Sequence, residues 1–178
     1  KSVSDVLLQE RKAAKTAQTR EAAELRPPIV HCADAREWLR NQPECDLLLT
    51  DPPYSTEIPD IAAFAQSWLP LALSKVKPTG RAYVCIGPYP KELLAYLSVV
   101  LPTQVLVWTY RNTLGPTPKQ HYKNNWQAIL YYEGAEAGPL DCPEMLEQFS
   151  VQDINAPDGR QGERYHEWQK PTPLAERF

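Results

Sequence analysis

Short apolar runs alternate with helical amphipathic patterns through the middle of the chain. Strand-like runs are predicted at 29–32, 46–50, 81–86 and 104–110, and helices at 35–41, 60–76 and 90–100. In the longest helical pattern the apolar residues recur at helical spacing, and we assign them to core packing: Ile61, Phe64, Ala65, Trp68, Leu69 and Leu71. This alternation predicts an α/β fold with a mostly parallel, doubly wound sheet.

The chain before this region has a different composition. Residues 1–26 are predicted to form one charged, alanine-rich helix with few large apolar side chains, which Arg26-Pro27-Pro28 ends. We therefore divide the chain into an N-terminal helix or linker, 1–26, and one domain, 27–178. The helix either connects to an upstream domain or packs on the main domain or on a second copy of the chain, and the pattern leaves these alternatives open.

The chain after residue 110 is less regular. A β-rich run at 126–132, bounded by Gly134, predicts one antiparallel strand. The segments on either side of it, 110–126 and 133–164, are predicted to be loops, and the second is rich in Gly, Pro and acidic residues. We expect both loops to contribute to a recognition surface.

A four-residue motif, Asp51-Pro52-Pro53-Tyr54, directly follows the apolar run 47–50, which we interpret as a buried strand. The Asp51 carboxylate and the Pro52 carbonyl would each accept a hydrogen bond from an exocyclic amine, which concentrates the lone pair on its nitrogen. Two prolines fix φ and remove backbone donors, so the carbonyl oxygens are free to face a ligand. Tyr54 offers a flat face on which an extruded base would stack. The motif predicts methyl transfer to an amine, and the alternative is a Pro-rich turn that ends a strand.

The motif in this context resembles the DNA amino-methyltransferases that use S-adenosylmethionine. It is most similar to their permuted beta group, in which the Asp-Pro-Pro-Tyr strand precedes the cofactor-binding glycine loop. The resemblance covers residues 29–178. It implies a Rossmann-like methyltransferase domain, S-adenosylmethionine as cofactor, double-stranded DNA as partner, and a catalytic role for Asp51, Pro52, Pro53 and Tyr54.

Two segments resemble the parts of that family that hold the cofactor. Residues 29–34 resemble a strand whose final acid contacts the adenosyl group, and Ala35 begins the helix after it. Residues 165–171 resemble the segment that closes over the methionine end of the cofactor. The resemblance therefore implies the following cofactor-binding residues: Asp34, Ala35, Asp51, His166, Gln169, Lys170 and Pro171.

The glycine loop of the family, Phe-x-Gly-x-Gly, is expected shortly after Phe178, where the chain ends. No Gly-x-Gly occurs in the 178 residues, and the first residue is Lys1 rather than Met. We therefore expect the chain to be a piece of a longer protein and half of the cofactor site to lie outside it.

The formal net charge is −3, which is unfavourable for a nucleic-acid partner, but the cationic residues are unevenly distributed. No acid occurs between Tyr110 and Trp126, where aromatic and amide side chains accompany the cationic ones. We predict that this segment binds phosphates and bases through Arg111, Lys119, His121, Tyr122, Lys123 and Asn125. The alternative is a solvated loop that covers the catalytic face, and the two roles are compatible.

Composition adds little that is specific. The four cysteines lack metal-ligand spacing and are predicted to be buried free thiols: Cys32, Cys45, Cys85 and Cys142. His and Cys are too scattered to indicate a metal site. No stretch is apolar and long enough to cross a membrane, and no signal peptide is visible, so we expect a cytoplasmic protein.

These patterns and the resemblance together predict a site-specific DNA methyltransferase. The resemblance favours adenine N6 as the acceptor, because an acid precedes the two prolines. Cytosine N4, or an amine on RNA or protein, is the alternative acceptor. An alternative of another class is a non-catalytic nucleic-acid-binding module without a cofactor loop, which would show no saturable binding of S-adenosylmethionine. The sequence leaves open which DNA site is read, whether the protein is a monomer or a homodimer, and whether it serves restriction-modification or acts alone.

Overall fold

A computed structural model describes residues 29–112, 118–142, 145–157 and 169–178, together with positions 6, 9–10, 13–14, 17, 21 and 166. It divides the chain into two compact units, Lys1–Asp34 and Ala35–Phe178. In the first unit, the described positions up to residue 21 are helical. Most of the helix predicted over 1–26 lies outside the described residues, and the domain boundary after residue 26 stays a prediction.

The second unit is built on a five-stranded sheet in the order β1-β2-β4-β3-β5. Its strands are β1 (Cys45–Thr50), β2 (Val76–Ile86), β3 (Gln104–Thr109), β4 (Trp126–Glu133) and β5 (Val151–Asp153). β1 is parallel to β2 and β3 is parallel to β5, whereas β4 is antiparallel to both of its neighbours. Every strand except β4 therefore runs in the same direction, which confirms the predicted mostly parallel α/β fold with one antiparallel strand.

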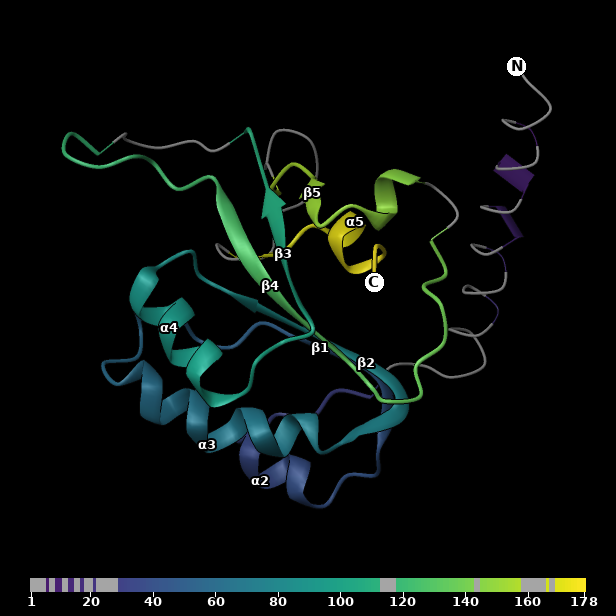
Figure 1. Cartoon of the computed structure of the whole chain (residues 1–178), viewed down its shortest axis with the longest axis horizontal. Coiled ribbons are helices and arrows are strands. Elements are labelled where there is room, and N and C mark those ends of the chain that lie inside the picture. The colour runs from purple at the N-terminus through teal and green to yellow at the C-terminus, as the bar shows by residue number, and fades with distance from the viewer. Residues whose placement is uncertain are drawn as a thin grey trace. The chain divides into compact units, whose positions relative to one another are not determined.

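Helices cover both faces of this sheet. The helices are α2 (Ala35–Arg40), α3 (Ile61–Leu73), α4 (Pro90–Val99) and α5 (Thr172–Ala175). Figure 1 shows α3 and α4 together on one side of the sheet and α5 on the other. The start of α3 is fixed by Asp60, whose carboxylate accepts a hydrogen bond from Ala63 N at 3.0 Å. None of the described helices has the length and apolar character needed to span a membrane.

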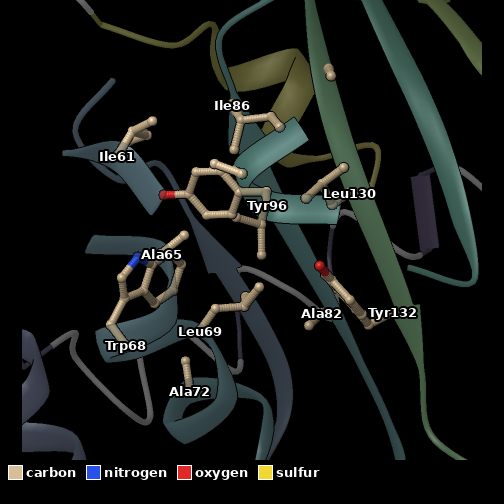
Figure 2. Close-up of a cluster of buried hydrophobic side chains, with 13 residues drawn as sticks. Ile61, Ala65, Trp68, Leu69, Ala72, Ala82, Ile86, Tyr96, Leu130 and Tyr132 are labelled. Carbon is tan, nitrogen blue, oxygen red and sulfur yellow. The ribbon is translucent and has the colours of Figure 1, made fainter. Parts of the chain in front are cut away.

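The larger apolar cluster lies between the sheet and helices α3 and α4 (Figure 2). The stripe predicted on α3 is the helical side of this cluster, with Ile61, Trp68 and Leu69 buried. Leu71 is the exception, because it is half-buried and lies outside the cluster. Tyr96 of α4 is fully buried, and its ring lies edge-on to Trp68 with 6.1 Å between centroids. Alternate residues of β2 and β4 face this cluster: Ala82, Val84, Ile86, Ala128, Leu130 and Tyr132.

The opposite face of the same two strands packs in a second cluster. Tyr83 and Cys85 of β2 join residues of β3 and β4 there, and Leu174 of α5 covers them. Phe178 stacks on Tyr83 with 4.2 Å between ring centroids. Both faces of β2 and β4 are therefore buried, which explains their nearly continuous apolar sequences.

Two predictions about strands are wrong. Residues 29–32 have no regular structure, and Ile29 and Val30 are 81% and 89% exposed. A short apolar run becomes a strand only by pairing its backbone with a neighbour, and the strand pairs of the described residues do not include this run. β1 is accordingly an edge strand rather than a buried one, and Leu47 and Leu49 are exposed while Leu48 packs on the α3–α4 cluster.

Two further differences concern short elements and the cysteines. The segment 133–164, predicted to be irregular, contains β5 and a 3-10 turn at Met145–Gln148, because three residues are too few to reveal a strand period. All four cysteines are free thiols, but only Cys85 is buried. Cys32 is exposed because the strand predicted around it does not form.

The larger cluster generates a stability prediction. Leu69→Ala should lower the free energy of unfolding by about 2–5 kcal/mol, because it leaves a cavity at a site with no exposure. The matched control is Leu94→Ala on α4, where the side chain is 69% exposed and the expected change is within about 0.5 kcal/mol. Urea unfolding measures both changes, and equal losses would contradict this packing of α3 against the sheet.

Candidate functional site

The loops after β1, β2 and β3 leave the sheet on the same side, at the edge formed by the carboxyl ends of these strands. Thr50 and Ile86 end the parallel strands β1 and β2 at this edge. Thr109, the last residue of β3, pairs with Trp126, the first residue of antiparallel β4. In open α/β sheets, ligands bind beyond the carboxyl ends of the strands. Asp51 lies at this edge, and the segment predicted to bind DNA starts and finishes there.

A compact polar cluster surrounds the motif at this edge. The Tyr54 hydroxyl donates a hydrogen bond to Asp51 Oδ1 at 2.6 Å and lies 3.2 Å from Gln127 Oε1. Lys170 Nζ lies 2.7 Å from Asp51 Oδ2 and 2.6 Å from Tyr54 Oη. Residues more than a hundred positions apart in the chain therefore meet at one carboxylate.

The cluster keeps Tyr54 neutral and fixes its ring. Burial, followed by the hydrogen bond and negative charge of Asp51, raises the pKa of Tyr54 far above its ordinary value. The phenol therefore stays protonated near neutral pH and can donate a hydrogen bond. The Lys170 ammonium also lies 5.2 Å from the centre of the Tyr54 ring, a cation–π contact on one face of that ring.

Cys85 lies beside the motif on the neighbouring strand. Burial, and next the negative charge of Asp51, raises the pKa of its thiol to about 12. A thiol with this pKa stays protonated near neutral pH, whereas a nucleophilic cysteine must be a thiolate. Cys85 therefore contributes an apolar wall to the site rather than covalent chemistry.

A cavity of about 110 Å³ adjoins Asp51 on the α5 side of the sheet. Its walls are mainly apolar and are formed by Leu49, Thr50, Asp51, Cys85, Lys170, Leu174, Ala175 and Phe178. Pockets that enclose a drug-sized ligand usually measure roughly 300–1,000 Å³. The described residues therefore surround only part of a ligand the size of a nucleoside.

The remaining predicted motif and cofactor residues lie in different settings. Pro52 is buried and Pro53 is exposed, and the chain turns directly after the motif, at residues 55–57. Asp34 is the exposed last residue of the first unit, and Ala35 begins α2. Of the other predicted cofactor residues, His166 is exposed and Gln169 is half-buried. Pro171, the residue before α5, is buried. Their roles toward a cofactor stay predictions.

The predicted DNA-binding residues are mostly exposed at the same sheet edge. Tyr122 is 99% exposed, and Lys119, His121 and Asn125 are also exposed, whereas Lys123 is half-buried. Arg111 forms an ion pair of 2.8 Å with Asp153 at the end of β5. The segment itself contains no acid, and β5 was not predicted, so the sequence did not indicate this acidic partner. Residues 113–117 lie outside the described part of the chain.

Sequence reasoning missed two residues near the motif: Gln127, which belongs to the cluster, and Glu92, whose carboxylate accepts a hydrogen bond from Ser55 N. Gln127 was counted only as part of a β-rich run, and Glu92 only as part of a helical pattern. The available signals were a polar side chain in an apolar strand and an acid on the apolar side of α4. Across the described ranges, no group of His, Cys, Asp and Glu is arranged to hold a metal ion.

Comparison with known proteins identifies the fold. No protein-family model and no curated protein matches the sequence. Among solved structures, the cytosine-N4-specific PvuII DNA methyltransferase matches with a TM-score of 0.63 and 18% identity over 82% of this chain and 67% of that one. M1.HpyAVI in its complex with SAM matches with a TM-score of 0.54 and 15% identity, over 80% of this chain and 68% of that one. The chain therefore has the α/β fold of these proteins and spans about two thirds of each.

The burial of Cys85 predicts a loss of stability at alkaline pH. The thiol ionises near pH 9.0 in the unfolded chain and near 12 in the folded one, so the unfolded state releases a proton that the native state keeps. Stability should therefore fall as pH rises above 9, by up to about 1.4 kcal/mol per pH unit. Urea unfolding at pH 8 and 10 should show a smaller decline for Cys85→Ala than for the unaltered protein. Cys32→Ala, at an exposed thiol, is the control, and equal declines in both variants would refute the assignment.

Proposed function

We propose that this chain carries the catalytic motif of a DNA amino-methyltransferase that uses S-adenosylmethionine. The observation that carries the proposal is the position of Asp51 and Tyr54, at the carboxyl edge of the sheet in a fold shared with a DNA methyltransferase. Asp-Pro-Pro-Tyr supplies the acceptors that an exocyclic amine requires, at the edge where ligands of open α/β sheets bind.

The chain's own residues act on the acceptor amine. The Asp51 carboxylate and the Pro52 carbonyl accept its two N–H groups, so the lone pair is concentrated on nitrogen and the charge that develops there is stabilised. Pro53 restricts the backbone after the Pro52 carbonyl, and the Tyr54 ring supports the extruded base. Held in this way, the nitrogen would accept the methyl group that the cofactor supplies and would then release its surplus proton to solvent.

The cavity beside Asp51 fits part of the proposed cofactor. S-adenosylmethionine, when bound, supplies an activated methyl group on a cationic sulfonium. Apolar walls from Leu174 and Phe178 suit its uncharged groups. The Asp51 carboxylate attracts its positive charge, and the Lys170 ammonium paired with that carboxylate offsets part of this attraction. By resemblance, the further contacts are assigned to Asp34, Ala35, His166, Gln169 and Pro171.

Lys170 receives a more specific role than the resemblance implied. Its ammonium binds the same carboxylate that the amine would use. An ionised carboxylate offers about four acceptor positions, and Tyr54 and Lys170 occupy two of them, so an amine N–H can still bind Asp51. We propose that Lys170 orients this carboxylate and forms the border between the acceptor side and the cavity.

The proposed acceptor is adenine N6, with cytosine N4 as the second candidate. An acid before the two prolines supports adenine, and the likeness to the cytosine-N4-specific PvuII enzyme supports cytosine. Both are exocyclic amines beside a ring nitrogen, and both would match the acceptors of Asp51 and Pro52. The segment from Arg111 to Asn125 is proposed to hold the DNA near this site.

Methyl transfer from labelled S-adenosylmethionine to unmethylated DNA tests the reaction. Asp51→Ala should lower the rate by about 100-fold or more, because it removes one acceptor of the amine. The matched control is Asp46→Ala, which removes an exposed acid of β1, the strand before the motif. Asp46 pairs with Lys77, and its loss should leave the rate unchanged.

The identity of the product decides between the two acceptors, since N6-methyladenine and N4-methylcytosine are separable nucleosides. Undiminished transfer by Asp51→Ala would exclude the proposed site. DNA binding without transfer and without saturable cofactor binding by the intact protein would instead support the non-catalytic module.

DNA affinity measured over a range of salt concentrations tests the segment. Lys119→Ala should reduce the salt dependence by about one phosphate contact, because its exposed ammonium releases one counterion. Tyr122→Ala should weaken binding with no change in salt dependence, because an exposed ring stacks rather than pairs with phosphate. Lys77→Ala, a cation already paired with Asp46, is the control. A uniform effect of all three variants would argue against a local DNA surface.

A further inference from the structure

Glu92 is a fully buried carboxylate that takes no part in the proposed chemistry. It lies in the first turn of α4 and accepts hydrogen bonds from two backbone N–H groups in different loops. One donor is Ser55 N, at 2.7 Å from Oε2, and the other is Gly87 N, which binds Oε1. Ser55 directly follows the Asp51–Tyr54 motif, and Gly87 directly follows β2. One side chain therefore joins the loops of two neighbouring parallel strands.

The burial of this carboxylate depends on the two N–H groups. A buried charge is costly unless it is hydrogen-bonded, and bonds to a charged acceptor are stronger than neutral ones. Within the described ranges, no Lys, Arg or His forms an ion pair with Glu92. Loss of its charge would therefore act directly on the two loops.

Gly87 provides the space for this contact. A Cβ atom at residue 87 would lie 3.1 Å from each Glu92 carboxylate oxygen and 2.8 Å from Tyr89 Cδ2. Both distances are shorter than ordinary van der Waals contact. A side chain at this position would therefore push Glu92 or Tyr89 aside. The observed position of the Glu92 carboxylate thus depends on glycine at residue 87.

The motif is held from two directions. Its side chains are held by the cluster of Asp51, Tyr54 and Lys170, and its backbone is held by the contact from Ser55 to Glu92. Methyl transfer requires a short, in-line approach, and a displacement of about 1 Å costs about 100-fold in rate. Freedom of the backbone at Ser55 would move the Pro52 carbonyl and the Tyr54 ring together.

We propose that Glu92 is a positioning residue that fixes the amine-polarising loop against strand β2. The inference rests on the proposed methyl transfer for its kinetic part only. Glu92 touches neither the acceptor base nor the cofactor. It determines where the acceptors of the motif lie relative to the cavity, so it affects the transfer step rather than the binding of either substrate.

The kinetic test uses Glu92→Gln in the intact protein. The amide keeps the shape of the carboxylate but has one acceptor oxygen, and its NH2 group faces one of the two N–H donors. We expect kcat to fall by about 10- to 100-fold, while the KM for S-adenosylmethionine and the Kd for DNA stay within about twofold. Gly87→Ala should give the same separation of kcat from KM.

The control is Tyr96→Phe, one turn further along α4. Its side chain is also fully buried, and within the described residues its hydroxyl has no hydrogen-bond partner. This variant should keep kcat within about twofold, which separates loop positioning from a general effect on the helix. An unchanged kcat in Glu92→Gln, or an equal loss in Tyr96→Phe, would overturn the inference.

A second measurement does not depend on activity. Amide hydrogen exchange of Ser55 should become faster in Glu92→Gln, whereas core amides such as that of Ile129 should keep their protection. Unchanged exchange at Ser55 would show that Glu92 does not hold the loop. If the unaltered protein transfers no methyl group, the proposed function and the kinetic part of the inference fail, and exchange at Ser55 still decides whether Glu92 tethers the loop.

Discussion

The burial of β2 and β4 on both faces is the constraint on which the second unit depends. Their side chains alternate between a cluster under α3 and α4 and a cluster under α5, so neither strand can shift by one residue without moving its whole apolar set. The register of β1 and β3 is set by pairing with these strands. Core packing away from the proposed site therefore places the strand ends at which the loops begin, including the loop with the Asp51 motif.

At that edge, polar contacts rather than apolar packing hold the chain in position. β1 is an edge strand with exposed leucines, so apolar burial does little to fix the loop that begins at Asp51. Hydrogen bonds and an ion pair hold this loop in place instead. Tyr54 and Lys170 meet at the Asp51 carboxylate, and the buried Glu92 binds the backbone beyond the motif. Both contacts come from segments remote in the chain, which makes the motif depend on the complete second unit.

The same arrangement links the proposed acceptor side to the proposed cofactor side. Asp51 and Lys170 belong to the polar cluster and also line the cavity, whose other walls are mainly apolar. In the proposed reaction, this carboxylate would interact with the acceptor amine on one side and with the positive charge of the cofactor on the other. The raised pKa values of Tyr54 and Cys85 keep both groups neutral, so Asp51 and Lys170 carry the charge in this cluster.

The sequence by itself determined the α/β class, the helices α3 and α4, the antiparallel β4 and the motif, because periodicity and short-range turn chemistry are local properties. It failed at 29–32 and at β1, since burial of a strand depends on a partner that pattern does not reveal. Only the tertiary structure decided that Lys170 reaches Asp51, that Arg111 pairs with Asp153, and that Glu92 joins two loops. These contacts connect residues from different elements, and the relative positions of those elements are set by the packing of the whole sheet.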